Sequence, residues 1–439
     1  MAKPYLGDIL PRSDASWPLS ASCSWVAEMT TKLEREIGLV GAVLLGLGSM
    51  LGSGVFVSIG LAENMVGWWV LPAILLAALV ASCNALSSAQ LAASHARAGG
   101  TYEYGYVFLF PAAGFTAGTM FLLAKSASAA TAALAFAAYL DALIGTDLTL
   151  VPVALTLIVA LTALVLAGLR RANWLNAAIV LLVVAALAVF VVLGGVSQDA
   201  EPLNSVQASA PNFLHACALL FVAFTGYGRV ATMAEEVRDP KRTIPPAILA
   251  TIAVTTILYL GVGHVLTLHA GSLTDAATPL EAASRAFGPE WLVIVVAAAA
   301  MLAMIGVLLN LILGLSRVLL AMGRRGDAPA LFGKLRGGEP VAAIVGMAVV
   351  VGGLCLLGDI RVAWTFSAMT VLVYYAITNA AALRLQGEER LFPRWIAWVG
   401  LAGCLGLAAF VPPLYWLSAS LALGAAFGLR TVIRLRLTS

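Results

Sequence analysis

Long apolar stretches follow one another along almost the whole chain, and they limit its fold more than any other feature. Each comes near the roughly 20 residues that an α-helix needs to cross a lipid bilayer. Twelve stretches can be delimited, at residues 39–60, 68–92, 110–140, 148–169, 175–195, 212–234, 246–268, 290–319, 340–357, 362–384, 396–411 and 414–430. The alternating pattern of a transmembrane β-barrel is missing. The sequence therefore predicts an all-α integral membrane protein with 12 transmembrane helices.

The composition agrees with this fold class. Charged residues make up 11% of the 439 residues, against about 25% in a soluble globular chain. A net charge of +3 gives no argument for binding nucleic acid. The five cysteines are scattered without metal-ligand spacing, so we expect no metal site and no cofactor. The N-terminus lacks the apolar core of a signal peptide, and we expect residues 1–38 to form a cytoplasmic segment.

The distribution of positive charge predicts an orientation. When the N-terminus is placed in the cytoplasm, all 25 lysines and arginines except four lie in cytoplasmic segments, as the positive-inside rule requires. The exceptions are Arg285 and Arg361 in outer loops, and Lys125 and Arg229 within or beside helices. We therefore expect a multi-pass protein of the cell membrane, a monomer or weak oligomer in the bilayer, with both termini cytoplasmic and residues 431–439 as the C-terminal tail.

Two of the twelve stretches are interrupted in the same way. The first has glycines at positions 46, 48, 52 and 54, and the sixth runs Phe221-Val-Ala-Phe-Thr-Gly-Tyr-Gly228. Glycine disfavours a helix by about 1 kcal/mol relative to alanine, and lipid cannot satisfy the backbone groups that an unwound segment frees. Paired interruptions at matching places in two halves are typical of a transporter's substrate site. Close helix packing through small residues is the alternative explanation.

The interruptions also predict how the chain is divided. Residues 39–195 and 212–384 form two halves of five helices each, with an interrupted helix at the start of each half. Because five is an odd number, the second half enters the membrane inverted relative to the first. Residues 396–430 add two further helices.

Four motifs, in order along the chain, resemble signatures of the amino acid–polyamine–organocation (APC) superfamily of permeases. The run Gly48-Ser-Met-Leu-Gly-Ser-Gly-Val-Phe56 is similar to its first helix, and Arg97-Ala-Gly-Gly-Thr-Tyr-Glu-Tyr104 to the loop after helix two. Phe224-Thr-Gly-Tyr with residues 235–245 resembles helix six and its loop, and residues 316–329 resemble the end of helix eight. The resemblance implies an amino acid permease with a leucine-transporter-type fold, in which 5+5 inverted repeats are followed by two C-terminal helices.

The resemblance also implies where the substrate binds. Its α-carboxylate is expected at the N–H groups of Ser53, Gly54 and Val55 in the unwound first helix, where the inner half-helix presents the positive end of its dipole. Its α-amino group is expected at carbonyl groups near Met50 and in the unwound part of helix six. The helix-six residues implied in the site are Phe221, Ala223, Phe224, Thr225 and Gly226, with Phe221 or Phe224 as an aromatic gate.

Departures from the family pattern bear on what drives transport. Sodium-coupled relatives of this fold use hydroxyl groups on helix eight, whereas residues 292–315 contain no Ser or Thr. Some proton-coupled members carry a lysine on helix five, where the alignment puts Leu182. Lys125 instead lies midway along the third stretch, where a charge costs about 3 kcal/mol. We interpret Lys125 as a candidate for coupling to protons, with a snorkelling lysine as the alternative.

The substrate's charge is inferred from absent carboxylates. None of the predicted spans contains a clearly buried Asp or Glu, and Ala124 stands where cationic carriers of the family place an acid. A neutral amino acid is therefore favoured, while an acidic substrate paired with Lys125 stays open. The sequence also leaves open a cationic amino acid or polyamine antiporter of the same family, and a non-transporting amino acid sensor on this scaffold. We expect no enzyme, because no nucleophile cluster or buried carboxylate pair is present.

Overall fold

The computed structural model of the protein describes residues 38–95, 99–167, 173–197, 208–229, 239–272 and 277–438. Within these ranges the chain is helical and contains no β-strand, which confirms the predicted all-α class. The predicted N-terminal segment, apart from Gly38, lies outside the described residues, as do parts of the motifs after helices two and six.

Eight helical stretches are long and apolar enough to cross a membrane. They are Gly54–Ser94, Pro111–Ile144 (α6), Asn176–Val196 in α8 (Asn173–Val196), Ala210–Tyr227, which begins with α9 (Ala210–Phe224), Arg242–Leu268 in α11 (Pro240–Leu268), Glu290–Arg324 (α13), Ile360–Ala382 (α15) and Pro413–Leu435 in α17 (Pro413–Thr438). Four shorter apolar helices fall on the remaining predicted stretches: α2 (Leu39–Met50), α7 (Leu150–Leu166), α14 (Val341–Cys355) and α16 (Arg394–Ala409). That all twelve stretches span the bilayer stays a prediction.

Short helices connect or extend these elements. They are the π-helices η1 (Gly54–Ser58) and η3 (Gly105–Leu109), the 3-10 turns η2 (Gly67–Trp69), η4 (Thr225–Tyr227), η5 (Ala270–Ser272), η6 (Ala330–Gly333) and η7 (Gly387–Glu389), and the α-helices α3 (Ile59–Val66), α5 (Thr101–Tyr104) and α12 (Pro279–Phe287). The long helix α4 (Val70–Ser94) completes the Gly54–Ser94 stretch.

The first broken helix is longer than predicted, and this corrects one expectation. After its interruption it runs through η1 and α3 to Val66 rather than stopping at residue 60. The added turn brings in Glu63, whose side chain is buried. Glu63 lies outside the predicted span 39–60, so the search for buried carboxylates missed it because that span ended too early.

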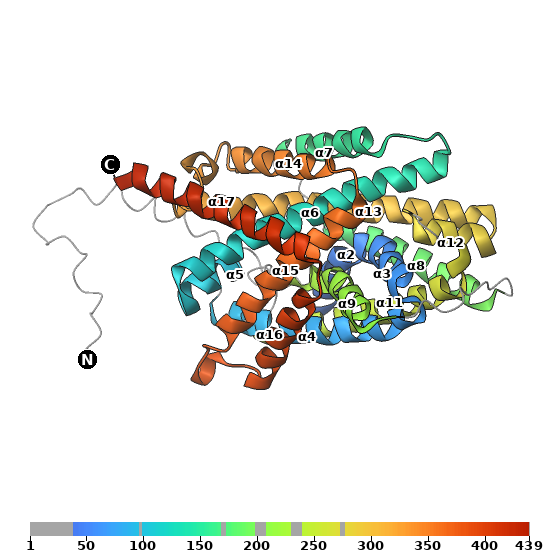
Figure 1. Ribbon diagram of the computed structural model, residues 1–439, viewed down its shortest axis with the longest axis horizontal. Coiled ribbons are helices and arrows are strands. Elements are labelled where there is room, and N and C mark those ends of the chain that lie inside the picture. Colours follow the sequence, from blue (N-terminus) through green and yellow to red (C-terminus); the bar gives the residue numbers. More distant parts are fainter. Residues whose placement is uncertain are drawn as a thin grey trace, which may run out of the picture.

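Helix α6 lies at the centre of the packing. It contacts α13 and α15 most extensively, and most of its buried residues are alanine, serine or glycine. Such small side chains allow neighbouring backbones to approach closely. One polar bond crosses to α15, between the hydroxyl groups of Ser128 and Ser367 at 2.8 Å. Helices α7 and α14 pack side by side and form one edge of the molecule (Figure 1).

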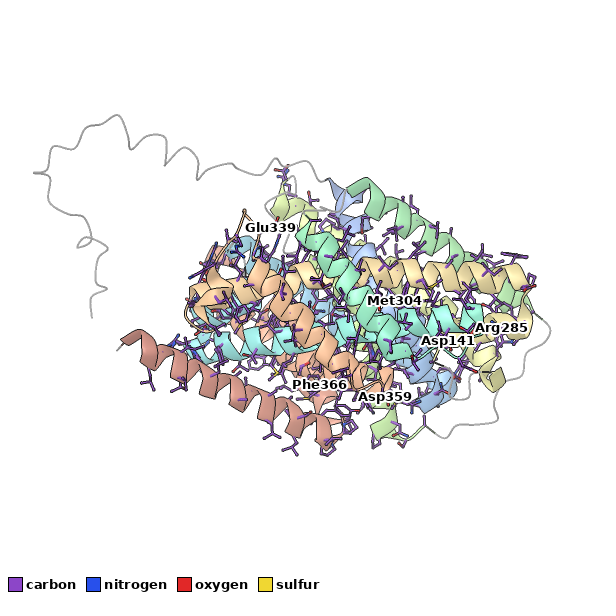
Figure 2. The ribbon with its side chains drawn as sticks, turned by 90° about the horizontal axis from the view of Figure 1, so that it is seen from above. Asp141, Arg285, Met304, Glu339, Asp359 and Phe366 are labelled. Carbon is purple, nitrogen blue, oxygen red and sulfur yellow. The ribbon has the colours of Figure 1, made fainter. Side chains whose placement is uncertain are left out.

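Helix α17 crosses the front of the molecule in Figure 1 and lies along its lower edge in Figure 2, so it packs on the outside of the other helices. Near its end it is anchored to Asp327, which follows α13. The guanidinium groups of Arg430 and Arg434 donate to Oδ1 of Asp327 at 2.8 and 2.9 Å. The hydroxyl groups of Tyr102, at 2.7 Å, and of Tyr106 donate to Oδ2 of the same carboxylate. We call these five residues the anchor cluster.

The two tyrosines of the anchor cluster hold their protons firmly. Burial, with the hydrogen bond to Asp327 as a second cause, raises the pKa of Tyr106 to about 12 and also raises the pKa of Tyr102. Both phenols therefore remain hydrogen-bond donors at physiological pH. The guanidinium of Arg325 lies 4.1 Å from the centre of the Tyr106 ring and donates to Glu103 at 2.6 Å. The cluster thus joins three segments that are far apart in the sequence.

Candidate functional site

The first helix is broken where the glycine pattern predicts. Helix α2 ends at Met50, Leu51 adopts φ −80° and ψ 86°, and the helix resumes at Gly54. The helix N-terminus at this break belongs to the half that follows it, which is the outer half in the predicted orientation. The expectation that the inner half-helix presents its positive end here was therefore wrong, because α2 turns its C-terminus to the break.

Two of the four backbone amides at this helix start, from Ser53 to Phe56, make no hydrogen bond within the described residues. Those of Val55 and Phe56 both donate to the carbonyl of Gly52, at 3.1 and 3.2 Å. The amides of Ser53 and Gly54 have no acceptor in the part of the chain that the structure describes. Free amides at the N-terminus of a helix attract anions such as a carboxylate.

The sixth helix is also broken as predicted. Helix α9 ends at Phe224, and the chain tightens into the 3-10 turn η4. The Thr225 hydroxyl donates to the carbonyl of Val222 at 2.7 Å, and the hydroxyl of Tyr375 on α15 donates to the carbonyl of Thr225 at 3.4 Å. Side chains thus take up backbone groups that the break frees.

The two breaks touch each other. A Cβ atom on Gly226 would lie 2.4 Å from the carbonyl oxygen of Ser49, and one on Gly54 would lie 2.8 Å from the Cβ of Ala223. Glycine is required at both positions, because any side chain would collide with the opposite break. The predicted pairing of the two interruptions is therefore present in the structure as direct contact.

Tyr259 of α11 joins the two breaks. Its hydroxyl lies 2.9 Å from the carbonyl oxygen of Met50 and 3.3 Å from that of Ala223. Its ring lies 5.1 Å from that of Phe224, and a Cβ on Gly54 would lie 2.6 Å from its hydroxyl oxygen. The tyrosine is fully buried. It is a site residue that the sequence analysis missed.

Lys125 reaches the same place from α6. Its ammonium group donates to the hydroxyl oxygen of Thr225 at 2.8 Å, in the break of helix six. None of the ion pairs formed within the described ranges includes Lys125. The side chain therefore points into the protein at the candidate site, which argues against the snorkelling alternative.

Two further helices line the first helix. A Cβ on Gly52 would lie 2.5 Å from a methyl group of Val307 on α13, and one on Gly48 would lie 2.6 Å from the amide oxygen of Asn176 on α8. Asn176 was not foreseen. Leu182 is 49% exposed on the outside of α8, so the expectation that it stands at the ion position was wrong. The residues of α8 that face Gly48 on the first helix are Asn176 and Val180.

The structure brings the predicted site residues together around the two breaks. All are buried except the half-exposed Gly226: Met50, Ser53, Gly54, Val55, Phe221, Ala223, Phe224 and Thr225. Phe221 packs edge-on against Tyr375 at 5.7 Å, and Phe224 packs against Tyr259 with the two rings tilted by 53°. Within the described ranges, no group of three or more His, Cys, Asp or Glu side chains could hold a metal ion.

Comparison with known proteins agrees with this geometry. A family described as Amino acid permease matches residues 41–432. An uncharacterized transporter of Mycobacterium tuberculosis is 41% identical over 420 residues, which cover 93% of this chain and 94% of the relative. A branched-chain amino acid permease of Bacillus subtilis is 24% identical over 86% of each chain. Cationic amino acid transporter 4 of Mus musculus is 29% identical over 82% of this chain and 61% of its own. The chain therefore belongs to the amino acid permease family of the APC superfamily, a family of membrane transporters.

Proposed function

We propose that the protein moves neutral amino acids across the cell membrane by alternating access, driven by exchange or by protons rather than by sodium. The meeting of the two helix breaks is the observation that supports this most directly. The free amides of Ser53 and Gly54 lie beside the carbonyl groups of Met50 and Ala223. An amino acid carries a carboxylate and an ammonium group on one carbon atom, and these two sets of backbone groups match that pair.

A neutral side chain is favoured by the charge at the site. The ammonium of Lys125 at Thr225 would repel a cationic side chain, and Ala124 beside it offers no counter-charge. The buried Glu63 lies nine residues beyond Gly54 on the first helix, roughly 13 Å along the helix axis at about 1.5 Å per residue. That distance is too long for a direct contact with a small substrate held at the breaks.

The second candidate is transport of cationic amino acids or polyamines by exchange. It rests on the relative named Cationic amino acid transporter 4, whereas the relative named as a branched-chain amino acid permease points to neutral substrates. The Lys125 ammonium supports the neutral class, since two cations at one buried site repel strongly. A sensor that binds an amino acid without moving it is the third candidate.

Helix α13, which packs against the first break, supports the proposal that sodium does not drive transport. Val307 covers Gly52 there, and residues 292–315 offer no hydroxyl group as an ion ligand. Lys125 is the proposed coupling residue, since its cation already touches the broken helix six. The Lys125 ammonium, whether it stays protonated or exchanges its proton, would supply the positive charge that a sodium ion supplies in sodium-coupled carriers.

Counterflow in proteoliposomes tests the proposal. Vesicles loaded with one unlabelled amino acid should take up the same labelled amino acid, and a panel of neutral, acidic and cationic compounds then ranks substrates. We expect branched-chain or small neutral amino acids to compete at least tenfold better than lysine, arginine or putrescine. An imposed sodium gradient should have no effect. Uptake that requires sodium, or exchange of cationic compounds alone, would contradict the proposal, and binding without any exchange would point to the sensor.

A further inference from the structure

The hydroxyl of Tyr259 occupies an unusual position. It is fully buried and lies within hydrogen-bond distance of one carbonyl oxygen from each broken helix, 2.9 Å from Met50 and 3.3 Å from Ala223. Its ring packs against that of Phe224 at 5.1 Å. Gly54 leaves room for the hydroxyl, since a Cβ there would lie only 2.6 Å away.

A phenol has one proton to share between these two acceptors, whereas an ammonium group has three and also carries a charge. Hydrogen bonds from charged donors are roughly twice as strong as those between neutral groups. Met50 and Ala223 are buried, so the loss of a donor to their carbonyl groups is costly. The Met50 carbonyl also accepts from the Gly52 amide at 3.0 Å, so the cost falls mainly on Ala223. The neutral tyrosine hydroxyl is therefore suited to bind these carbonyl groups while the substrate site is empty. The ammonium group of a bound amino acid, as the stronger donor, can displace it.

We propose that the Tyr259 hydroxyl holds the place of the substrate's ammonium group. It donates to Met50 and Ala223 while the site is empty, and it yields them when an amino acid binds. This inference rests on the proposed function, because it requires that the ammonium group binds at the two breaks. Its consequence is that the empty carrier keeps both breaks satisfied and can change conformation without cargo.

The substitution Tyr259→Phe removes the hydroxyl and keeps the ring. Both carbonyl groups then lose this donor in the empty state only, although that of Met50 keeps its bond from the Gly52 amide at 3.0 Å. The affinity for the transported amino acid should therefore rise about tenfold. The affinity for the same molecule without its amino group, the corresponding carboxylic acid, should not change. Net uptake, which needs return of the empty carrier, should slow roughly tenfold relative to exchange. An unchanged or weakened affinity for the amino acid would overturn the inference.

Tyr139→Phe is the matched control. Tyr139 of α6 is equally buried. Its hydroxyl donates at 2.9 Å to the carbonyl of Phe56, which lies just after the break in the first helix. This variant should melt at a lower temperature without changing the ratio of the two affinities. An equal change of that ratio in both variants would mark the effect as general loosening and would count against Tyr259.

A second measurement keeps the hydroxyl and so does not depend on the variant's folding. With 3-fluorotyrosine placed at position 259 alone, the ¹⁹F resonance should shift when the amino acid saturates the carrier and stay in place with the carboxylic acid. An unmoved resonance would overturn the inference. If the wild-type protein binds no amino acid in either assay, the proposed function itself fails, which is a separate outcome.

Discussion

At the scale of single residues, Lys125 carries the proposal on coupling. Replacing it with alanine removes the ammonium group that touches Thr225. We expect Lys125→Ala to lower uptake driven by an inward proton gradient at least tenfold and to flatten its dependence on pH. Proteoliposome uptake measured with and without the gradient checks this.

Ser126→Ala is the matched control for Lys125. Ser126 is the next residue on α6, it is fully buried, and its hydroxyl has no hydrogen-bond partner among the described residues. Uptake should stay within about twofold of wild type. Transport by Lys125→Ala at the wild-type rate and with the wild-type pH profile would remove Lys125 from the mechanism.

Gly226 tests the contact between the two breaks. A methyl group at this position would lie 2.4 Å from the Ser49 carbonyl oxygen, which is backbone and cannot rotate away. Overpacking of this kind costs about 1–3 kcal/mol, so Gly226→Ala should lower the melting temperature in detergent by several degrees and abolish exchange. Gly314→Ala on α13 is the control, because nothing lies within 4 Å of its added Cβ. Equal melting temperatures for the two variants would contradict the observed contact.

At the scale of elements, the anchor cluster fixes the end of α17. Asp327 has a fully buried carboxylate that accepts four hydrogen bonds. Removing the charge from a buried ion pair costs about 3–5 kcal/mol, so Asp327→Asn should strongly lower thermal stability. Arg434 is 49% exposed, and an exposed pair contributes less than about 1 kcal/mol. Arg434→Gln should therefore be nearly silent in the same melting assay, and similar losses for both variants would refute this ranking.

The same cluster predicts an alkaline limit of stability. The pKa of Tyr106 is raised to about 12 in the folded protein from an ordinary value of 10. A raised pKa stabilises the protonated phenol, so its contribution is complete below pH 10 and is lost as the pH rises toward 12. The melting temperature should therefore fall over this range, and the fall should be smaller in Tyr106→Phe. An identical alkaline profile in that variant would contradict the prediction.

At the scale of the whole molecule, the topology can be tested across α14, one of the shorter helices. Leu335 precedes this helix and Leu357 follows it, and both side chains are exposed. If α14 spans the bilayer as predicted, a cysteine at 357 should react with a membrane-impermeant maleimide in intact cells, whereas one at 335 should react only after lysis. The four native cysteines of the described ranges are buried, and Cys23 is first replaced by serine. Equal labelling of both positions would rule out the predicted span.

Much of the element pattern was predictable because apolar length is a strong signal in lipid. The glycines at 52, 54 and 226 also marked both breaks correctly. Glycine has a low helix propensity, and at these positions a side chain would collide with a neighbouring helix. Tyr259 and Asn176 were missed, although each is a polar side chain in an otherwise apolar stretch. Their roles depend on which face of α11 or α8 meets the first helix, and a hydrophobic stretch without a polar face does not reveal that. Leu182 was misplaced for the same reason.

The alanine-rich surface of α6 has a consequence for motion. Helices that interlock through long side chains resist sliding, because each must leave one set of holes before entering the next. A surface of methyl and hydroxymethyl groups has shallow relief, so we expect α13 and α15 to shift along it without large rotamer changes. Two polar bonds leave α6, from Lys125 to Thr225 and between Ser128 and Ser367. These bonds then favour particular positions of the neighbouring helices along α6. On this view the resting positions of the carrier are set by a few polar contacts, and the ease of moving between them by the lack of bulk around α6.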